Sequence, residues 1–240
     1  MVHQMLIVNI ACRLSWHLRK QTSRTRLTRS IFSTNRSGSL RRSTPLARSA
    51  PNPQFSIRSN HCAQVPAITY GGPDVDPEDP SPLSFKLAES RVILQFIAEL
   101  YPESGLLPND PVERAKVLFF MDTVDRHFDG PGIEWRVGRT ESYEGYLKGV
   151  EMVQGLLPES GEFAVGDRYT IADACIAPLL SRLKVTCETD IGRFQVGQGH
   201  KLGEELKTPK FAKFMRYAQT MLERPSLRDS HDEVRRCIKR

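Results

Sequence analysis

The octapeptide GDRYTIAD, residues 166–173, opens a long apolar run and decides the fold of this chain. Thr170 is a favourable N-cap, because its hydroxyl can accept a hydrogen bond from a backbone N–H at the start of a helix. Asp173 can accept from the N–H of Thr170 in return, which makes the pair a reciprocal capping box. Residues 174–180 are nearly all apolar, so the helix that follows is expected in the middle of a helical bundle. The role predicted for Thr170 and Asp173 is structural.

Helical periodicity extends on both sides of this segment. Helices are predicted from Glu89 to about residue 101, from 111 to 128, from about 141 to 157 and from about 208 to 223, with an interruption at Gly130-Pro131-Gly132. The inner face expected for the last helix consists of Phe211, Phe214, Met215, Ala218 and Leu222.

Two short strands are expected ahead of the first helix. Residues 65–70 have strand composition, and residues 84–87 can pair back antiparallel to them. If the Val65–Pro66 bond is cis, the backbone of Val65 becomes free to pair with a ligand. Glu89 and Ser90 add a carboxylate and a hydroxyl beside the unpaired N–H groups of a helix, which attract a carboxylate. Together these groups suit one small zwitterionic peptide.

The charge of the chain is divided. Residues 1–73 contain eleven Lys and Arg and no Asp or Glu, whereas the other 167 residues carry a net charge of −5. The overall charge of +6 therefore belongs to the leader, and the body is not expected to bind nucleic acid. Residues 1–62 are predicted to be a disordered basic leader. Their composition is that of a mitochondrial transit peptide, or else they are an unrelated stretch that replaces a lost half-domain.

The five cysteines form neither a disulfide framework nor a zinc motif, because their spacing is irregular. A reducing compartment is therefore expected, the cytoplasm first and the mitochondrion as the alternative that the leader offers. Cys175 is expected to fill the core. The apolar run of residues 5–12 is too short to span a bilayer, so no membrane association is predicted. No metal site is predicted either, because no pair of Cys or His has the spacing of zinc ligands.

Over roughly residues 64–230 the chain resembles the soluble glutathione transferases. The matching segments are Val65-Pro66, Glu89-Ser90, residues 98–102, residues 106–108, residues 166–173 and residues 224–226. An acidic insert after residues 70–73 is similar to that of fungal members. The resemblance implies a mainly α fold: an all-α bundle over residues 110–230, preceded by a truncated thioredoxin-like α/β remnant over residues 63–104.

The resemblance also implies a function, which is transfer of glutathione, as co-substrate, to electrophilic small molecules in detoxification. Val65 would pair its backbone with the cysteinyl part of glutathione, Glu89 would lie near its ammonium group and Ser90 on its carboxylate. A pocket for the second substrate is expected at Phe120, Thr123 and His127, with core packing or a solvated face as the alternative for each. Family members are usually homodimers.

The resemblance fails where the family places its catalytic Tyr, Ser or Cys. The region before Val65 does not have the expected strand–helix–strand pattern, and only Cys12 and Ser15 offer a hydroxyl or thiol at a comparable place. The catalytic residue is therefore left open, with these two as candidates. A chain without the usual catalytic segment has impaired catalysis or serves as a non-catalytic protein-interaction module, and this second class remains the alternative.

Overall fold

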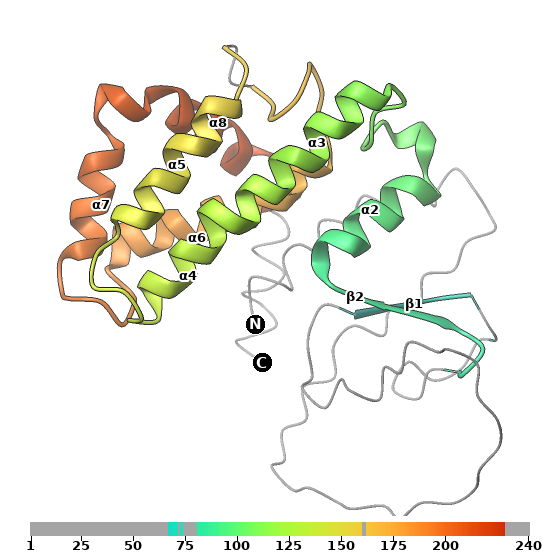
Figure 1. The fold of residues 1–240 in the computed structure, drawn as a ribbon, viewed down its shortest axis with the longest axis horizontal. Helices are drawn as coiled ribbons and strands as arrows, with labels where there is room; N and C mark the ends of the chain where they lie inside the picture. The colour runs from blue at the N-terminus through green and yellow to red at the C-terminus, as the bar shows by residue number, and fades with distance from the viewer. Residues whose placement is uncertain (1–66, 72, 74–80, 160–161, 229–240) are drawn as a thin grey trace, which may run out of the picture. The chain divides into compact units, whose positions relative to one another are not determined.

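The computed structural model describes residues 67–71, 73, 81–159 and 162–228, which form two units (Figure 1). The first unit contains the strands and ends at Glu89, and the second contains the helices and begins at Ser90. The helix after Ser90 thus lies in the helical unit. The domain boundary expected between residues 104 and 110 stays a prediction.

The strand unit is a two-stranded antiparallel hairpin. Strand β1 (Ala67–Tyr70) pairs with β2 (Phe85–Ala88), so that Ala67 lies opposite Ala88 and Tyr70 opposite Phe85. The antiparallel pairing expected from the sequence is confirmed. Two strands alone are marginally stable in water.

The helical unit is a bundle with one central helix. Its elements are α2 (Ser90–Leu100), η2 (Pro102–Ser104), α3 (Pro111–Thr123), η3 (Val124–Asp129), α4 (Gly130–Arg136), α5 (Glu144–Leu156), α6 (Ile171–Thr189), α7 (Gln198–Leu206), η4 (Pro209–Phe211) and α8 (Ala212–Glu223). Helix α6 packs against α2, α3, α7 and α8 (Figure 1). None of the helices in the described part of the chain is long and apolar enough to cross a membrane. The mainly helical fold expected from the sequence is confirmed.

Helix α6 is central because its whole first half is buried, from Ile171 to Ser181. Its N-terminus is the predicted capping box. The Thr170 hydroxyl accepts from the N–H of Ala172 at 3.3 Å, and the Asp173 carboxylate accepts from the N–H of Thr170 at 2.9 Å. Pro178 lies within the helix without ending it.

The Asp173 carboxylate does more than cap α6. It is fully buried and also accepts from the N–H of Ala164 at 2.7 Å and from the hydroxyl of Tyr217 in α8 at 2.9 Å. Burial and the neighbouring carboxylate raise the pKa of Tyr217 well above its ordinary value, so Tyr217 keeps its proton and donates. One carboxylate therefore joins α6, α8 and the segment that precedes α6.

The predicted interruption at Gly130-Pro131-Gly132 is wrong. Helix α3 continues through the π-helical turn η3 directly into α4, and Pro131 is the second residue of α4. The turn lies against α5 at Gly149, where an added Cβ would overlap the carbonyl oxygen of His127. The helix therefore continues through Gly130 and Gly132 at the wide turn, which packs closely against the backbone of α5.

The C-terminal helices also differ from the prediction. Helix α7 was not expected, because Gly197 at φ +89° precedes it and no capping side chain marks its start in the sequence. The carboxylate of Asp190, in the preceding loop, accepts instead from the N–H groups of Gly197 at 2.5 Å and Gly199 at 2.7 Å. In α8, Met215 is 36% exposed, and Tyr217 is buried in its place on the inner face.

We expect Asp173→Ala to lower the free energy of unfolding by at least about 3 kcal/mol, because it leaves buried N–H and O–H donors without an acceptor. Asp110→Ala is the matched control. Asp110 is an exposed N-cap that accepts from the N–H of Glu113 at 2.9 Å, and its loss should cost about 1 kcal/mol. Urea unfolding followed by circular dichroism measures both. Equal losses would contradict the assigned role of Asp173.

Candidate functional site

Glu89 and Ser90 stand where the chain passes from β2 into α2. Glu89 adopts φ +70°, a left-handed conformation that is uncommon for a residue other than glycine and costs about 1–2 kcal/mol. The helix begins at Ser90, one residue later than expected, so Glu89 precedes it and is exposed.

The N-terminus of α2 carries backbone donors that have no acceptor within the helix. The first four N–H groups of a helix have no intrahelical acceptor, and the helix dipole makes that end attractive to an anion. Helix α2 is eleven residues long and has no acidic residue in its first turn. The hydroxyl of Ser90, which is half-buried, lies in that first turn. This arrangement suits a ligand carboxylate.

An ion pair anchors the first turn of α2 to the bundle. Arg91 Nη1 lies 2.7 Å from Asp125 Oδ2 in η3. One turn further along, Asp129 lies 3.6 Å from Arg136 and 3.9 Å from Arg182. Burial raises the pKa of Asp129, and the two arginines oppose this shift. The sequence gives no signal for the pairs of Arg91 with Asp125 and of Arg182 with Asp129, because their members are far apart along the chain.

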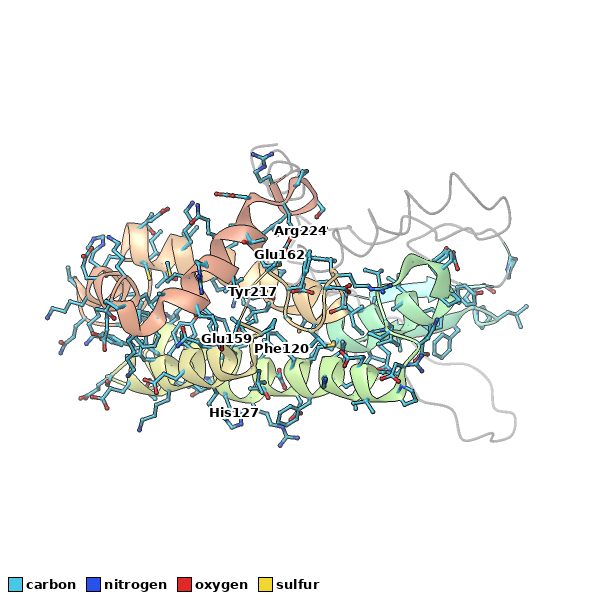
Figure 2. The ribbon with its side chains drawn as sticks, turned by 90° about the horizontal axis from the view of Figure 1, so that it is seen from above. Phe120, His127, Glu159, Glu162, Tyr217 and Arg224 are labelled. Carbon is cyan, nitrogen blue, oxygen red and sulfur yellow. The ribbon has the colours of Figure 1, made fainter. Side chains whose placement is uncertain are left out.

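The residues predicted for a second-substrate pocket lie in different environments (Figure 2). Phe120 is buried with its ring edge-on to Tyr217, at 6.5 Å between centroids. The hydroxyl of Thr123 is turned to its own helix and donates to the carbonyl of Phe119 at 2.9 Å. His127 is exposed. A pocket shared by these three residues stays a prediction.

The other predicted site residues, Cys12, Ser15, Val65 and Pro66, lie outside the described residues. The backbone contact of Val65 with glutathione and the choice between Cys12 and Ser15 as thiol partner therefore stay predictions. Among the residues that the structure describes, no group of three or more His, Cys, Asp or Glu side chains could hold a metal ion.

The described cysteines are not activated thiols. Cys175 is buried in α6, as expected for a core residue, and Cys187 is half-buried near the end of the same helix. Burial raises the pKa of Cys175 to about 12 and the pKa of Cys187 to about 12. A catalytic cysteine needs a lowered pKa, so neither residue is a candidate nucleophile.

Comparisons with solved structures show that the fold is of the glutathione transferase type. Glutathione transferase Omega 2C from Trametes versicolor is 46% identical, with a TM-score of 0.64, over 70% of this chain and 71% of that protein. Omega 2S from the same fungus, solved in complex with 2,4-dihydroxybenzophenone, is 32% identical, with a TM-score of 0.67, over 79% and 81%. The chain belongs to the glutathione transferase family.

Curated proteins give shorter matches, and no protein-family model matches the chain. A probable maleylacetoacetate isomerase of Caenorhabditis elegans is 30% identical over 114 residues, which are 39% of this chain and 49% of that protein. One from Drosophila melanogaster is matched over 41% of its length. The chain thus spans less than half the length of these curated relatives.

We expect the free energy of unfolding to fall as the pH rises from about 9 to about 11. In this range the unfolded chain releases thiol protons that the folded chain keeps, so the unfolded state binds fewer protons. The free energy of unfolding therefore decreases with pH, by up to about 1.4 kcal/mol per pH unit for each buried thiol. Urea unfolding at several pH values measures this slope. Cys175→Ala should make it shallower, and a stability that rises over this range would refute the assignment.

Proposed function

We propose that the protein binds glutathione at the entrance to α2 and transfers it to electrophilic small molecules. The glutathione thiolate attacks an electrophilic carbon, a sulfur–carbon bond forms, and the leaving group departs with its electron pair. The thiol proton passes to solvent or to a protein group. Cys12 and Ser15 remain the candidates for the group that stabilises the thiolate.

The observation that carries this proposal is the conformation of Glu89. A non-glycine residue in the left-handed region persists only where its surroundings enforce it, and such residues are concentrated at ligand sites. In the proposed site the Glu89 carboxylate lies beside the first N–H groups of α2 and the Ser90 hydroxyl. The γ-glutamyl end of glutathione carries an ammonium and a carboxylate next to each other. In the proposed complex Glu89 faces the ammonium, and Ser90 with the α2 N–H groups holds the carboxylate.

The named relatives support the choice of transferase chemistry. The two Trametes versicolor structures are glutathione transferases, and one of them holds an aromatic ketone. We extend to this chain the binding of glutathione and of a small, mainly apolar second substrate. The proposed partners are therefore small molecules and a second copy of the chain in a homodimer, in the cytoplasm or, given the leader, in the mitochondrion.

We expect Ser90→Ala to weaken glutathione binding about tenfold, which corresponds to about 1.4 kcal/mol, since it removes a donor to a carboxylate. Isothermal titration calorimetry on the full chain measures the dissociation constant. Ser142→Ala is the matched control, because Ser142 accepts from the N–H of Glu144 at the start of α5 but belongs to no predicted site. Equal weakening by both variants, or no binding by the unmodified chain, would refute the site.

A second pair of variants distinguishes the effect of the Glu89 carboxylate on glutathione binding from the effect of the Glu89 backbone conformation. Glycine adopts φ +70° without the Cβ penalty, so Glu89→Gly should not lower the melting temperature. Both Glu89→Gly and Glu89→Gln should nevertheless weaken glutathione binding, because each removes the negative charge that faces the ammonium. A loss of binding that appears only in Glu89→Gly would assign the effect to the backbone and contradict the proposed contact.

Turnover distinguishes a transferase from a non-catalytic module. Conjugation of glutathione to chlorodinitrobenzene, followed by absorbance, should be measurable in the full chain and should fall with Ser90→Ala. A chain that binds glutathione without turnover would be a binding module, and the transferase proposal would be wrong.

A further inference from the structure

The turn between α7 and α8 presents a threonine that is followed by a proline (Figure 1). In the full sequence a Ser or Thr precedes a proline at Thr44, Ser81 and Thr208. Thr44 lies outside the described residues, and Ser81 is only 8% exposed, with its hydroxyl accepting from the N–H of Leu83. Thr208 is exposed. Within the described part of the chain, Thr208 is therefore the accessible residue of this kind.

The exposed segment around Thr208 is several residues long. Residues 207–210 are all exposed, so the threonine and the proline after it can both be reached from solvent. The backbone of Thr208 is extended, with φ −66° and ψ 155°. A residue before proline is restricted to extended conformations, because the helical one brings it into contact with the proline ring. The threonine is thus presented at the surface in an extended conformation.

The hydroxyl of Thr208 has no partner in the core. It donates to the carbonyl of Glu205 at 2.7 Å, at the end of α7, and it does not cap the turn η4 that follows. The loss of an exposed hydrogen bond of this kind costs little, because water replaces the partner. The hydroxyl can therefore react without loss of a buried contact.

Two lysines flank the threonine. Lys207 Nζ lies 2.7 Å from a carboxylate oxygen of Glu204, and its side chain is 67% exposed. Lys210 pairs with Glu151 of α5, and its side chain is 61% exposed. Exposed ion pairs contribute little free energy, so both lysines can exchange their carboxylates for a stronger anion. A phosphate ester is such an anion, with about −1.5 to −2 charges at neutral pH.

We propose that Thr208 is a phosphorylation site for a proline-directed protein kinase that uses ATP. The Thr208 oxygen forms a bond to the γ-phosphorus of ATP, the bond from that phosphorus to the bridging oxygen breaks, and ADP departs with the electron pair. The hydroxyl proton passes to a basic group of the kinase. Lys207 and Lys210 then hold the phosphate.

The proline determines the class of kinase. Proline has no N–H, so it suits an active site that offers no acceptor to the residue after the threonine. Any other residue at that position would leave its N–H without a partner, which is a penalty that excludes wrong substrates. Lys207 and Lys210 make the segment basic, which disfavours a kinase that selects acidic segments.

The bundle keeps its fold after the modification. Lys210 leaves Glu151, but Gln154 of α5 still donates to the carbonyl of Lys210 at 2.9 Å and accepts from the N–H of Phe214 at 2.9 Å. The residues proposed for glutathione take no part. The circular dichroism spectrum and the dissociation constant for glutathione should therefore be unchanged by phosphorylation.

Incubation of the full chain with a purified cyclin-dependent kinase and magnesium ATP tests the proposal. Cleavage after glutamate releases residues 206–223, and mass spectrometry of this peptide identifies the residue that carries the phosphate. Phosphate should be found on Thr208 and be absent in Thr208→Ala. Pro209→Ala keeps the hydroxyl and should lower the incorporation about tenfold. Ser81→Ala is the matched control, because Ser81 also precedes a proline but is buried, and it should leave the incorporation into this peptide unchanged.

The second pKa of the phosphate tests the contact with the lysines. Phosphorus NMR of the modified chain should place this pKa below its ordinary value of about 6, because nearby cations favour the dianion. Lys210→Ala should raise the pKa toward the value in urea. Lys116→Ala should not, because Lys116 forms a similar exposed ion pair, with Glu113, on another helix.

Three results would overturn the proposal. They are no phosphate on Thr208 of the full chain, incorporation that Pro209→Ala does not reduce, and a phosphate pKa that Lys210→Ala and Lys116→Ala change equally. Phosphorylation of a synthetic peptide of residues 203–213, but not of the full chain, would show that the fold hides the threonine, and that result also overturns it.

Discussion

The helical unit depends on one buried carboxylate. Asp173 accepts hydrogen bonds from two backbone N–H groups and two hydroxyls, which come from the segment before α6, from its N-cap and from α8. A buried carboxylate is costly unless its oxygens are satisfied, so these donors stabilise the site only while all of them are in place. The first N–H of α6, from Ile171, donates to the carbonyl of Leu106 at 2.9 Å. The start of the central helix is thereby joined to the segment that follows α2.

Contacts within the same bundle also hold α2, the helix that follows the strained residue Glu89. Helix α2 is held at its C-terminal side by the bond between Leu106 and Ile171, and at its N-terminal side by the ion pair of Arg91 with Asp125. Helix α2 is therefore fixed within the bundle, and it begins directly after Glu89, which has φ +70°. The energy stored there is small compared with the burial of the apolar face of α2, which includes Ile93 and Ile97.

The sequence predicted those features whose causes are local. A capping box lies within four residues, and an apolar face recurs at helical spacing, so α6 and its cap, α2, α3 and the antiparallel strands were expected. The features that were missed depend on distant partners. Helix α7 starts at a cap provided by Asp190 across a loop, and the continuation through residues 130–132 needs the bare backbone of Gly149. Neither the ion pair of Arg91 with Asp125 nor the left-handed φ of Glu89 produces a recurring pattern in the sequence.

The state of the described thiols bears on the proposed chemistry. Cys175 and Cys187 both keep their protons at neutral pH because burial raises their pKa, so neither of them supplies the sulfur that reacts in the proposed transfer. In the proposed site the described residues hold the tripeptide by its charged end. A dipole and an unpaired set of N–H groups do this without a titrating side chain, so the carboxylate contact at α2 should persist over the whole pH range in which the fold is stable. Any pH dependence of turnover near neutrality then reports the glutathione thiol and the group that faces it, and not the residues at the entrance to α2.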